Sequence, residues 1–187
     1  IDAGVERGDR VAILGHNRVE WASAALGVQA AGAVFVPIYP SSTPEQIAYV
    51  VTHSDARVVF TDRALDLSVL TAGFDDSGPA TVSWSQLQAR GADVAQSTFE
   101  ARLASVNLDD PGLMLYTSGT SGQPKGVPLT HRNVGVNGRD WMRCLAPTLE
   151  EDDTYVLWLP LSHIFGFGEM CLGNSLGYTT WLSDPLA

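Results

Sequence analysis

Six consecutive residues, Thr117 to Gly122, are glycine, serine or threonine, and Lys125 follows three positions later. Hydroxyl groups supply hydrogen-bond donors, and glycines let backbone N–H groups turn toward one point, which forms a nest for an anion. A lysine adds a compact positive charge that suits a phosphate. A flexible spacer has a similar composition, but the apolar residues before Thr117 and the stiffening Pro124 do not suit a tether. The run therefore predicts a phosphate-binding loop.

The loop does not match the common phosphate motifs. A Walker loop reads GxxxxGK[ST]. Counting from Gly119, Pro124 stands in place of the second glycine, and Gly126 follows Lys125 where a serine or threonine is needed. The dinucleotide pattern GxGxxG is also absent from this stretch. The sequence predicts a different way of holding phosphate.

Other candidate groups are few. His163 follows an apolar run, and on residue type alone it either caps the next helix or faces a substrate. The four histidines and two cysteines show no metal-ligand spacing, so no metal site is predicted. The acidic run Glu150–Asp153 indicates a solvated turn. Two isolated cysteines favour reduced thiols and a cytoplasmic setting.

Composition limits the partners. The chain is 45% hydrophobic and 17% charged, as is typical of a globular protein, and its net charge is −10. Such a charge argues against broad electrostatic binding to nucleic acid or to an anionic membrane. No stretch approaches the ~18 consecutive apolar residues of a membrane span, which leaves peripheral membrane contact open.

The candidate groups need a scaffold, and the first third of the chain predicts one. Short apolar runs at 10–14, 34–38 and 57–61 indicate buried strands, and helical patterns separate them. Asn17 is expected to cap the first helix, and Thr43 followed by Pro44 is a strong start for the second. Strands alternating with helices predict an α/β fold with a parallel βαβαβ sheet layered with helices.

The expected organisation has three parts. Residues 1–62 form the βαβαβ unit, and residues 63–110 form a weakly patterned peripheral segment. Residues 111–187 hold the phosphate-loop hairpin, a helix capped by Thr130, a strand at 154–160 and a helix after His163.

Three stretches carry a family resemblance. "YTSGTSGQPKGV", residues 116–127, closely resembles the phosphate-loop signature of AMP-forming adenylating enzymes, which include acyl-CoA synthetases, luciferases and peptide-synthetase adenylation domains. "LPLSHIFGF", residues 159–167, resembles the next motif of that family, and residues 8–61 look like the start of a long-chain acyl-CoA synthetase. The resemblance covers nearly the whole chain and is least distinctive at 62–110.

The resemblance implies roles for particular residues. The loop and its lysine would hold the β- and γ-phosphates of ATP while a carboxylate attacks the α-phosphorus to give acyl-AMP. These residues are Thr117, Ser118, Gly119, Thr120, Ser121, Gly122 and Lys125. His163 would lie where the acyl group meets the α-phosphate, and Phe165, Gly166 and Phe167 would line the acyl entrance. Lys125 and His163 are thus the expected catalytic residues.

The resemblance also implies partners and limits. It implies a fatty acid and ATP as substrates, Mg²⁺ with the nucleotide, and CoA as the acyl acceptor. Alternatives are a fatty acyl-AMP ligase or another adenylating domain that loads a carrier protein, and a non-catalytic nucleotide- or acyl-binding module. The later motifs of the family are absent from these residues. We therefore expect these residues to form part of the N-terminal domain of such an enzyme, without its C-terminal domain, and to be inactive alone.

Overall fold

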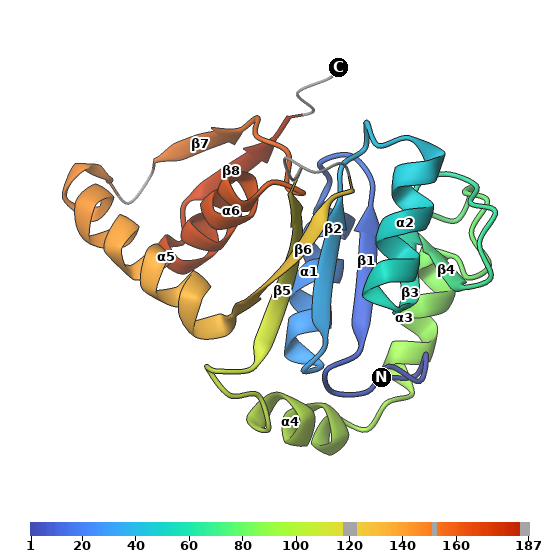
Figure 1. Cartoon of the computed structure of the whole chain (residues 1–187). Helices are drawn as coiled ribbons and strands as arrows, with labels where there is room; N and C mark the ends of the chain where they lie inside the picture. Colours follow the sequence, from blue (N-terminus) through green and yellow to red (C-terminus); the bar gives the residue numbers. More distant parts are fainter. Residues whose placement is uncertain (118–122, 151–152, 184–187) are drawn as a thin grey trace.

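The computed structural model describes residues 1–117, 123–150 and 153–183 (Figure 1). Within these residues, six strands form one sheet in the order β4-β3-β1-β2-β5-β6, and two form a second sheet. The strands are β1 (Arg10–Leu14), β2 (Val34–Ile38), β3 (Ala56–Thr61), β4 (Leu70–Gly73), β5 (Pro111–Thr117), β6 (Lys125–Thr130), β7 (Thr154–Leu157) and β8 (Thr179–Leu182). The helices are α1 (Val19–Ala30), α2 (Pro44–Ser54), α3 (Trp84–Ala92), α4 (Gln96–Ala104), α5 (His131–Leu145) and α6 (Ile164–Leu176), with a 3-10 turn, η1 (Ala146–Thr148).

The larger sheet is parallel from β4 to β5, and β6 closes it as the antiparallel partner of β5. The expected βαβαβ unit is present, with β1 between β2 and β3. Because β1, β2, β3 and β5 run the same way, the loops that follow them meet at one edge of the sheet. We call this the carboxyl edge.

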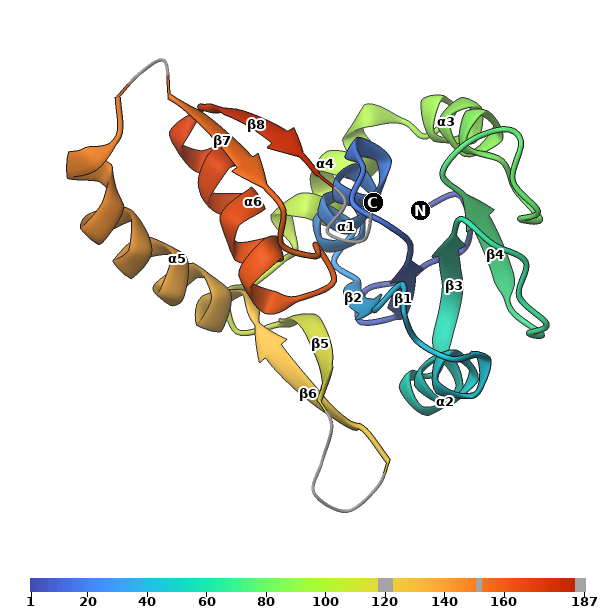
Figure 2. The same ribbon diagram turned by 90° about the horizontal axis from the view of Figure 1, so that it is seen from above.

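Different helices cover the two faces of the larger sheet (Figure 2). Alternate side chains of a strand point to opposite faces. On β1, Ile13 packs in the cluster that contains Trp21 of α1 and Phe167 of α6. Its neighbour Leu14 packs in the other cluster, with Val51 of α2. The sheet is therefore buried on both sides, which explains why its central strands are continuous apolar runs.

Helix starts follow the expected signals in two cases and not in a third. Thr43 and Thr130 each form a capping box with the residue three positions on. The expectation that Asn17 caps the first helix was wrong: α1 begins at Val19, and its N-cap Arg18 makes no capping side-chain bond. The side chain of Asn17 instead binds backbone from the far end of the chain.

The middle of the chain supplies an edge strand as well as surface helices. Helices α3 and α4 contain no buried residue. Strand β4, however, pairs in parallel with β3, and its Thr71 and Ala72 are buried. The weak pattern of residues 63–110 did not predict this strand.

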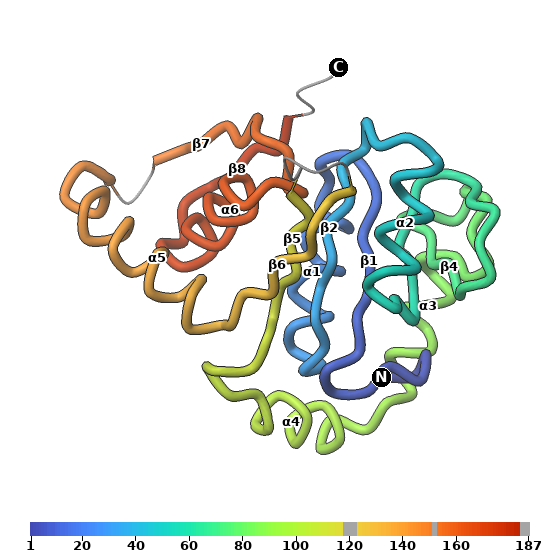
Figure 3. The backbone as a smooth tube through the Cα atoms, viewed as in Figure 1, coloured from blue at the N-terminus to red at the C-terminus, as the bar shows by residue number. Residues whose placement is uncertain are grey.

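The last part of the chain forms a second layered unit beside the sheet. The tube in Figure 3 runs from β6 through α5 and returns through β7, α6 and β8. Strands β7 and β8 pair in parallel, and Leu157 of β7 is fully buried with Phe167 and Met170 of α6. Among the described residues, no helix combines the length and apolar character needed to cross a membrane.

Candidate active site at the carboxyl edge

The β5–β6 hairpin brings the two ends of the predicted phosphate loop together. Thr117, the last residue of β5, is paired with Lys125, the first residue of β6, and Tyr116 is paired with Gly126. Of the predicted phosphate-binding residues, Thr117 and Lys125 are therefore neighbours across the ladder. Ser118, Gly119, Thr120, Ser121 and Gly122 lie outside the described residues.

Helix α2 holds both arms of this hairpin. The hydroxyl of Tyr49 donates to the carbonyl oxygen of Pro124 at 3.1 Å, and Nδ1 of His53 lies 2.7 Å from the hydroxyl of Tyr116. The three rings also pack on one another, with centroids of Tyr49 and His53 5.2 Å apart. Burial, followed by the neighbouring Tyr49, raises the pKa of the Tyr116 phenol, so it stays protonated at neutral pH. Both arms of the hairpin at the base of the loop are thus held by side chains of α2.

Lys125 is the only lysine in the chain. The residue is exposed at the start of β6. Among the described residues Lys125 forms no ion pair. The ion pairs that do occur there take their cations from arginines, apart from one that involves His16. The expected role of Lys125 at the phosphates stays a prediction.

His163 is the N-cap of α6, so it performs the capping role that its residue type allowed. Its Nδ1 accepts a hydrogen bond from the backbone N–H of Phe165 at 3.2 Å. A ring nitrogen that accepts carries no proton, so in this arrangement Nε2 holds the proton of the neutral ring. Capping fixes the ring at the helix start and leaves its Nε2–H as a donor. The predicted contact with substrate stays a prediction.

A small cavity joins the hairpin to His163. Its volume is about 80 Å³, and it lies where the ends of β2 and β5 meet the start of α6. The lining residues are Pro37, Tyr39, Leu115, Tyr116, Thr117, Ser162, His163 and Ile164. The rings of Tyr39 and His163 are 6.3 Å apart between centroids. The structure thus brings one end of the predicted phosphate loop and the predicted catalytic histidine to a single site.

The three residues predicted to line the acyl entrance occupy different environments. Phe165 is 50% exposed and makes an edge contact with Trp141 of α5, with ring centroids 5.3 Å apart. Phe167 is buried, and its ring centroid lies 4.9 Å from that of Phe35 of β2. Gly166 is buried with its Cα facing the carbonyl of Pro160. Only Phe165 of the three lines an open groove.

That groove lies between α5 and α6 and has a volume of about 510 Å³. Its lining is largely apolar and includes Trp141, Met142, Phe165 and Leu172. Ile164 lines both the groove and the small cavity beside His163. An apolar chain could therefore lie in the groove with a polar end at the cavity.

Asn17 is the functional-site residue whose placement the sequence pattern missed. Its Nδ2 donates to the carbonyl oxygens of Leu159 at 2.8 Å and Ser183 at 2.9 Å. Its Oδ1 accepts from the N–H of Leu161 at 2.8 Å. One side chain therefore ties the loop after β1 to the segment that leads into His163. Its position three residues after the end of a buried strand was the available signal.

Replacing Asn17 with alanine removes all three of these bonds. We expect the free energy of unfolding of the full-length protein to fall by about 1–3 kcal/mol, because partly buried backbone groups lose their partners. Urea denaturation measures the loss. Asn174→Ala, at an exposed position on α6, is the matched control and should change stability by less than about 0.5 kcal/mol. Equal effects of the two variants would contradict the assigned role.

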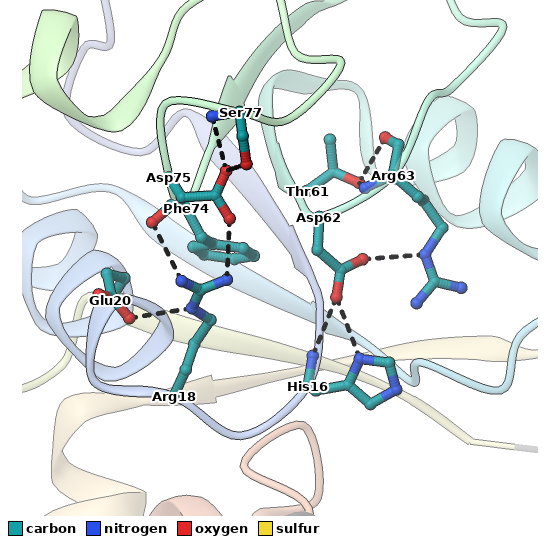
Figure 4. Close-up of polar contacts among 9 residues, drawn as sticks. All are labelled: His16, Arg18, Glu20, Thr61, Asp62, Arg63, Phe74, Asp75 and Ser77. Atoms are coloured by element: carbon teal, nitrogen blue, oxygen red, sulfur yellow. Dashed lines mark hydrogen bonds and ion pairs between the residues drawn. The ribbon is translucent and has the colours of Figure 1, made fainter.

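Two polar networks tie further loops together at the carboxyl edge (Figure 4). Asp62, after β3, contacts Nδ1 of His16 at 3.1 Å and Nε of Arg63 at 3.0 Å. Burial alone would raise the pKa of Asp62, but Arg63 and His16 hold it below its ordinary value, so the carboxylate stays ionised. Arg63 also donates to the carbonyl of Pro40, after β2, at 2.9 Å.

The second network in Figure 4 centres on Arg18. Its guanidinium donates to Glu20 at 2.9 Å, lies 3.5 Å from Asp75, and stacks over the ring of Phe74 at 5.6 Å. These contacts join the loops after β1 and β4. The charged side chains in both networks are engaged with one another, so they fix the loops that frame the site.

The residue pattern predicted no metal site, and that expectation stays a prediction. Within 1–117, 123–150 and 153–183, no group of three or more histidine, cysteine, aspartate or glutamate side chains could hold an ion. The described residues therefore contain no ready-made cage for the Mg²⁺ that the family resemblance implies. We derive no step through a metal.

Comparison with known proteins decides the family. The model of the family described as "AMP-binding enzyme" matches residues 1–187. The chain is an AMP-binding family member. The resemblance stated from the phosphate-loop signature is thereby confirmed.

The AMP-binding chain is similar to ligases that use different acids. It is 37% identical over 177 residues to the long-chain-fatty-acid–CoA ligase FadD15 of Mycobacterium bovis, covering 88% of this chain and 29% of the relative. It is 36% identical over 170 residues to the sulfoacetate–CoA ligase of Cupriavidus necator, covering 88% of this chain and 32% of the relative. The AMP-binding chain thus spans about a third or less of the length of these relatives.

A solved structure shows the same fold. The o-succinylbenzoate CoA synthetase MenE of Bacillus subtilis, in complex with the acyl-adenylate intermediate OSB-AMP, superposes with a TM-score of 0.74 at 24% identity. The match covers 96% of the AMP-binding chain and 34% of MenE. The expected α/β fold, with a mainly parallel sheet and covering helices, is confirmed.

Proposed function

We propose that the longer protein containing this chain activates a fatty acid with ATP to form acyl-AMP and then transfers the acyl group to CoA. The observation that carries the proposal is the cavity that holds Thr117, Tyr39 and His163 together at the carboxyl edge. The end of the phosphate-loop hairpin and His163 line the same small space. Membership of the AMP-binding family and similarity to a long-chain-fatty-acid–CoA ligase support this choice.

The proposed first step is a displacement at phosphorus. A carboxylate oxygen of the acid forms a bond to the α-phosphorus of ATP, and the bond from that phosphorus to the bridging oxygen breaks. Pyrophosphate leaves with the electron pair. Donors from Thr117 to Gly122, with Lys125, hold the β- and γ-phosphates, where negative charge grows as the bond breaks. The pairing of Thr117 with Lys125 supports this role, since it places both at the loop stem.

His163 is proposed to position the carboxyl end of the acid. Its Nδ1 is occupied by the helix cap, so its Nε2–H is the group that can donate to a carboxylate or acyl-phosphate oxygen. In the second step the thiol of CoA loses its proton to solvent and its sulfur forms a bond to the acyl carbon, and AMP leaves with the electron pair of the broken C–O bond.

The apolar groove between α5 and α6 favours a fatty acid over a short polar acid. Trp141, Met142 and Phe165 line it, and Ile164 connects it to the cavity beside His163. Each methylene removed from water contributes about 0.8 kcal/mol to binding.

The proposal includes a cytoplasmic setting, in line with two free cysteines, of which Cys171 has a pKa raised by burial to about 11.

A panel of acids tests the proposal on the full-length protein. We expect fatty acids of increasing length to support ATP–pyrophosphate exchange and CoA thioester formation. Sulfoacetate should give kcat/KM at least about 100-fold lower, because it lacks the methylenes that would be buried. Preference for sulfoacetate would contradict the fatty acid assignment, and exchange without thioester would favour a carrier-protein acceptor. The isolated 187 residues are expected to give no exchange above background.

A further inference from the structure

The hydroxyl of Ser162 is unusual among the polar groups of this site. Ser162 is 3% exposed, and its Oγ has no hydrogen-bond partner within the described part of the chain. The only other buried side-chain atom there without a partner is Nε1 of Trp21. Buried polar groups in folded proteins are nearly always paired, so a buried unpaired hydroxyl needs a reason.

The local backbone does not need this hydroxyl. The N–H of Leu161 is bound by Asn17 at 2.8 Å, and the N–H of His163 donates to Pro160 at 2.9 Å. The first turn of α6 is capped by His163, which accepts from Phe165. The capping role that a serine often performs at a helix start is therefore filled by His163.

Ser162 lines the cavity of about 80 Å³ that also contains Thr117, Tyr39 and His163. This volume exceeds the roughly 10–15 Å³ that one water molecule requires, so a small polar group fits. A serine hydroxyl is one donor with two acceptor lone pairs. Beside it in the sequence, the Nε2–H of His163 is a second donor. Both residues line the cavity, and a hydroxyl together with a ring N–H suits an anionic oxygen.

We propose that Ser162 is a substrate-binding residue, whose hydroxyl donates a hydrogen bond to the carboxylate of the acid and to the acyl-adenylate formed from it. The inference rests on the proposed function and adds a specific contact to it. The hydroxyl is unpaired in the free protein because its partner is the substrate. Its burial beforehand means that water does not compete for it once the acid has bound.

Ser162→Ala in the full-length protein tests this, because activity should fall while stability does not. Removal of an unpaired buried hydroxyl should leave the thermal midpoint unchanged or raise it. The KM for the fatty acid in ATP–pyrophosphate exchange should rise, and kcat/KM should fall by about 10- to 100-fold, the effect of losing a hydrogen bond to a charged group. Ser162→Thr keeps the hydroxyl and should recover most of this loss.

Ser97→Ala, on the exposed surface of α4, is the control and should match wild type in both measurements. Wild-type kcat/KM in Ser162→Ala would overturn the proposal. A parallel loss of stability and activity would also overturn it, because it would show that the hydroxyl has a structural partner. Each variant is compared on whichever acid supports exchange in wild type. Failure of the fatty acid assignment is therefore seen in wild type, separately from failure of the Ser162 contact.

Discussion

Lys125→Ala in the full-length protein is expected to lower carboxylate-dependent ATP–pyrophosphate exchange by about 10²- to 10³-fold, as when a preorganised donor to a developing anion is removed. Lys125 is exposed at the stem of the phosphate loop and forms no ion pair among the described residues. Its charge is therefore available to the phosphates of ATP. The same features mean that the fold should not depend on it.

Two further variants separate the local effect from a loss of net charge. Arg57→Ala removes a cation at the start of β3, at the opposite edge of the sheet, and should leave exchange near the wild-type rate. Lys125→Arg keeps the charge but changes its shape from a compact ammonium to a planar fork, so partial activity is expected. Wild-type exchange in Lys125→Ala would rule out the assigned role of the lysine.

Gly166→Ala is expected to be the most damaging single-methyl change in the site. A Cβ at this position would overlap the carbonyl oxygen of Pro160 and lie 2.7 Å from its carbon. The obstacle is backbone, so it cannot rotate away, and the loop or the helix must shift. We expect the free energy of unfolding to fall by about 1–3 kcal/mol or more. Exchange should fall with it, since Ser162 and His163 lie between the two colliding segments.

Gly168→Ala provides a control in the same helix. A Cβ there meets nothing within 4 Å, and alanine favours a helix over glycine by about 1 kcal/mol. We therefore expect Gly168→Ala to be neutral or stabilising in urea denaturation of the full-length protein. If both glycine variants changed the free energy of unfolding equally, close packing of α6 on Pro160 would not explain the glycine at position 166.

The scaffold of the site was predictable because its signals are local. The apolar runs at 10–14 and 34–38 became β1 and β2 with the same bounds, since a strand buried on both faces must be apolar throughout. Thr43 and Thr130 began helices because their capping partners lie only three residues away. The phosphate-loop hairpin followed from its motif, although the roles of its central residues stay a prediction.

The remaining features depend on contacts between distant segments. Asn17 carries the local signature of a helix cap, but its partners are about 140 positions or more along the chain. Strand β4 is short and adds to the sheet through pairing with β3, which no pattern within residues 63–110 reveals. The unpaired hydroxyl of Ser162 is a property of the packed structure. A sequence periodicity contains none of this information.

The tie made by Asn17 also sets the order in which the site can assemble. Its hydrogen bonds to Leu159, Leu161 and Ser183 join positions separated by 142, 144 and 166 residues. The β1–α1–β2 unit, by contrast, closes through segments about 24 residues apart along the chain, from Arg10 to Val34. Long loops close at a higher entropic cost and more slowly than short ones. During synthesis the β1–α1–β2 unit can therefore form first, and the bonds from Asn17 to the segment before Ser162 and His163 close later.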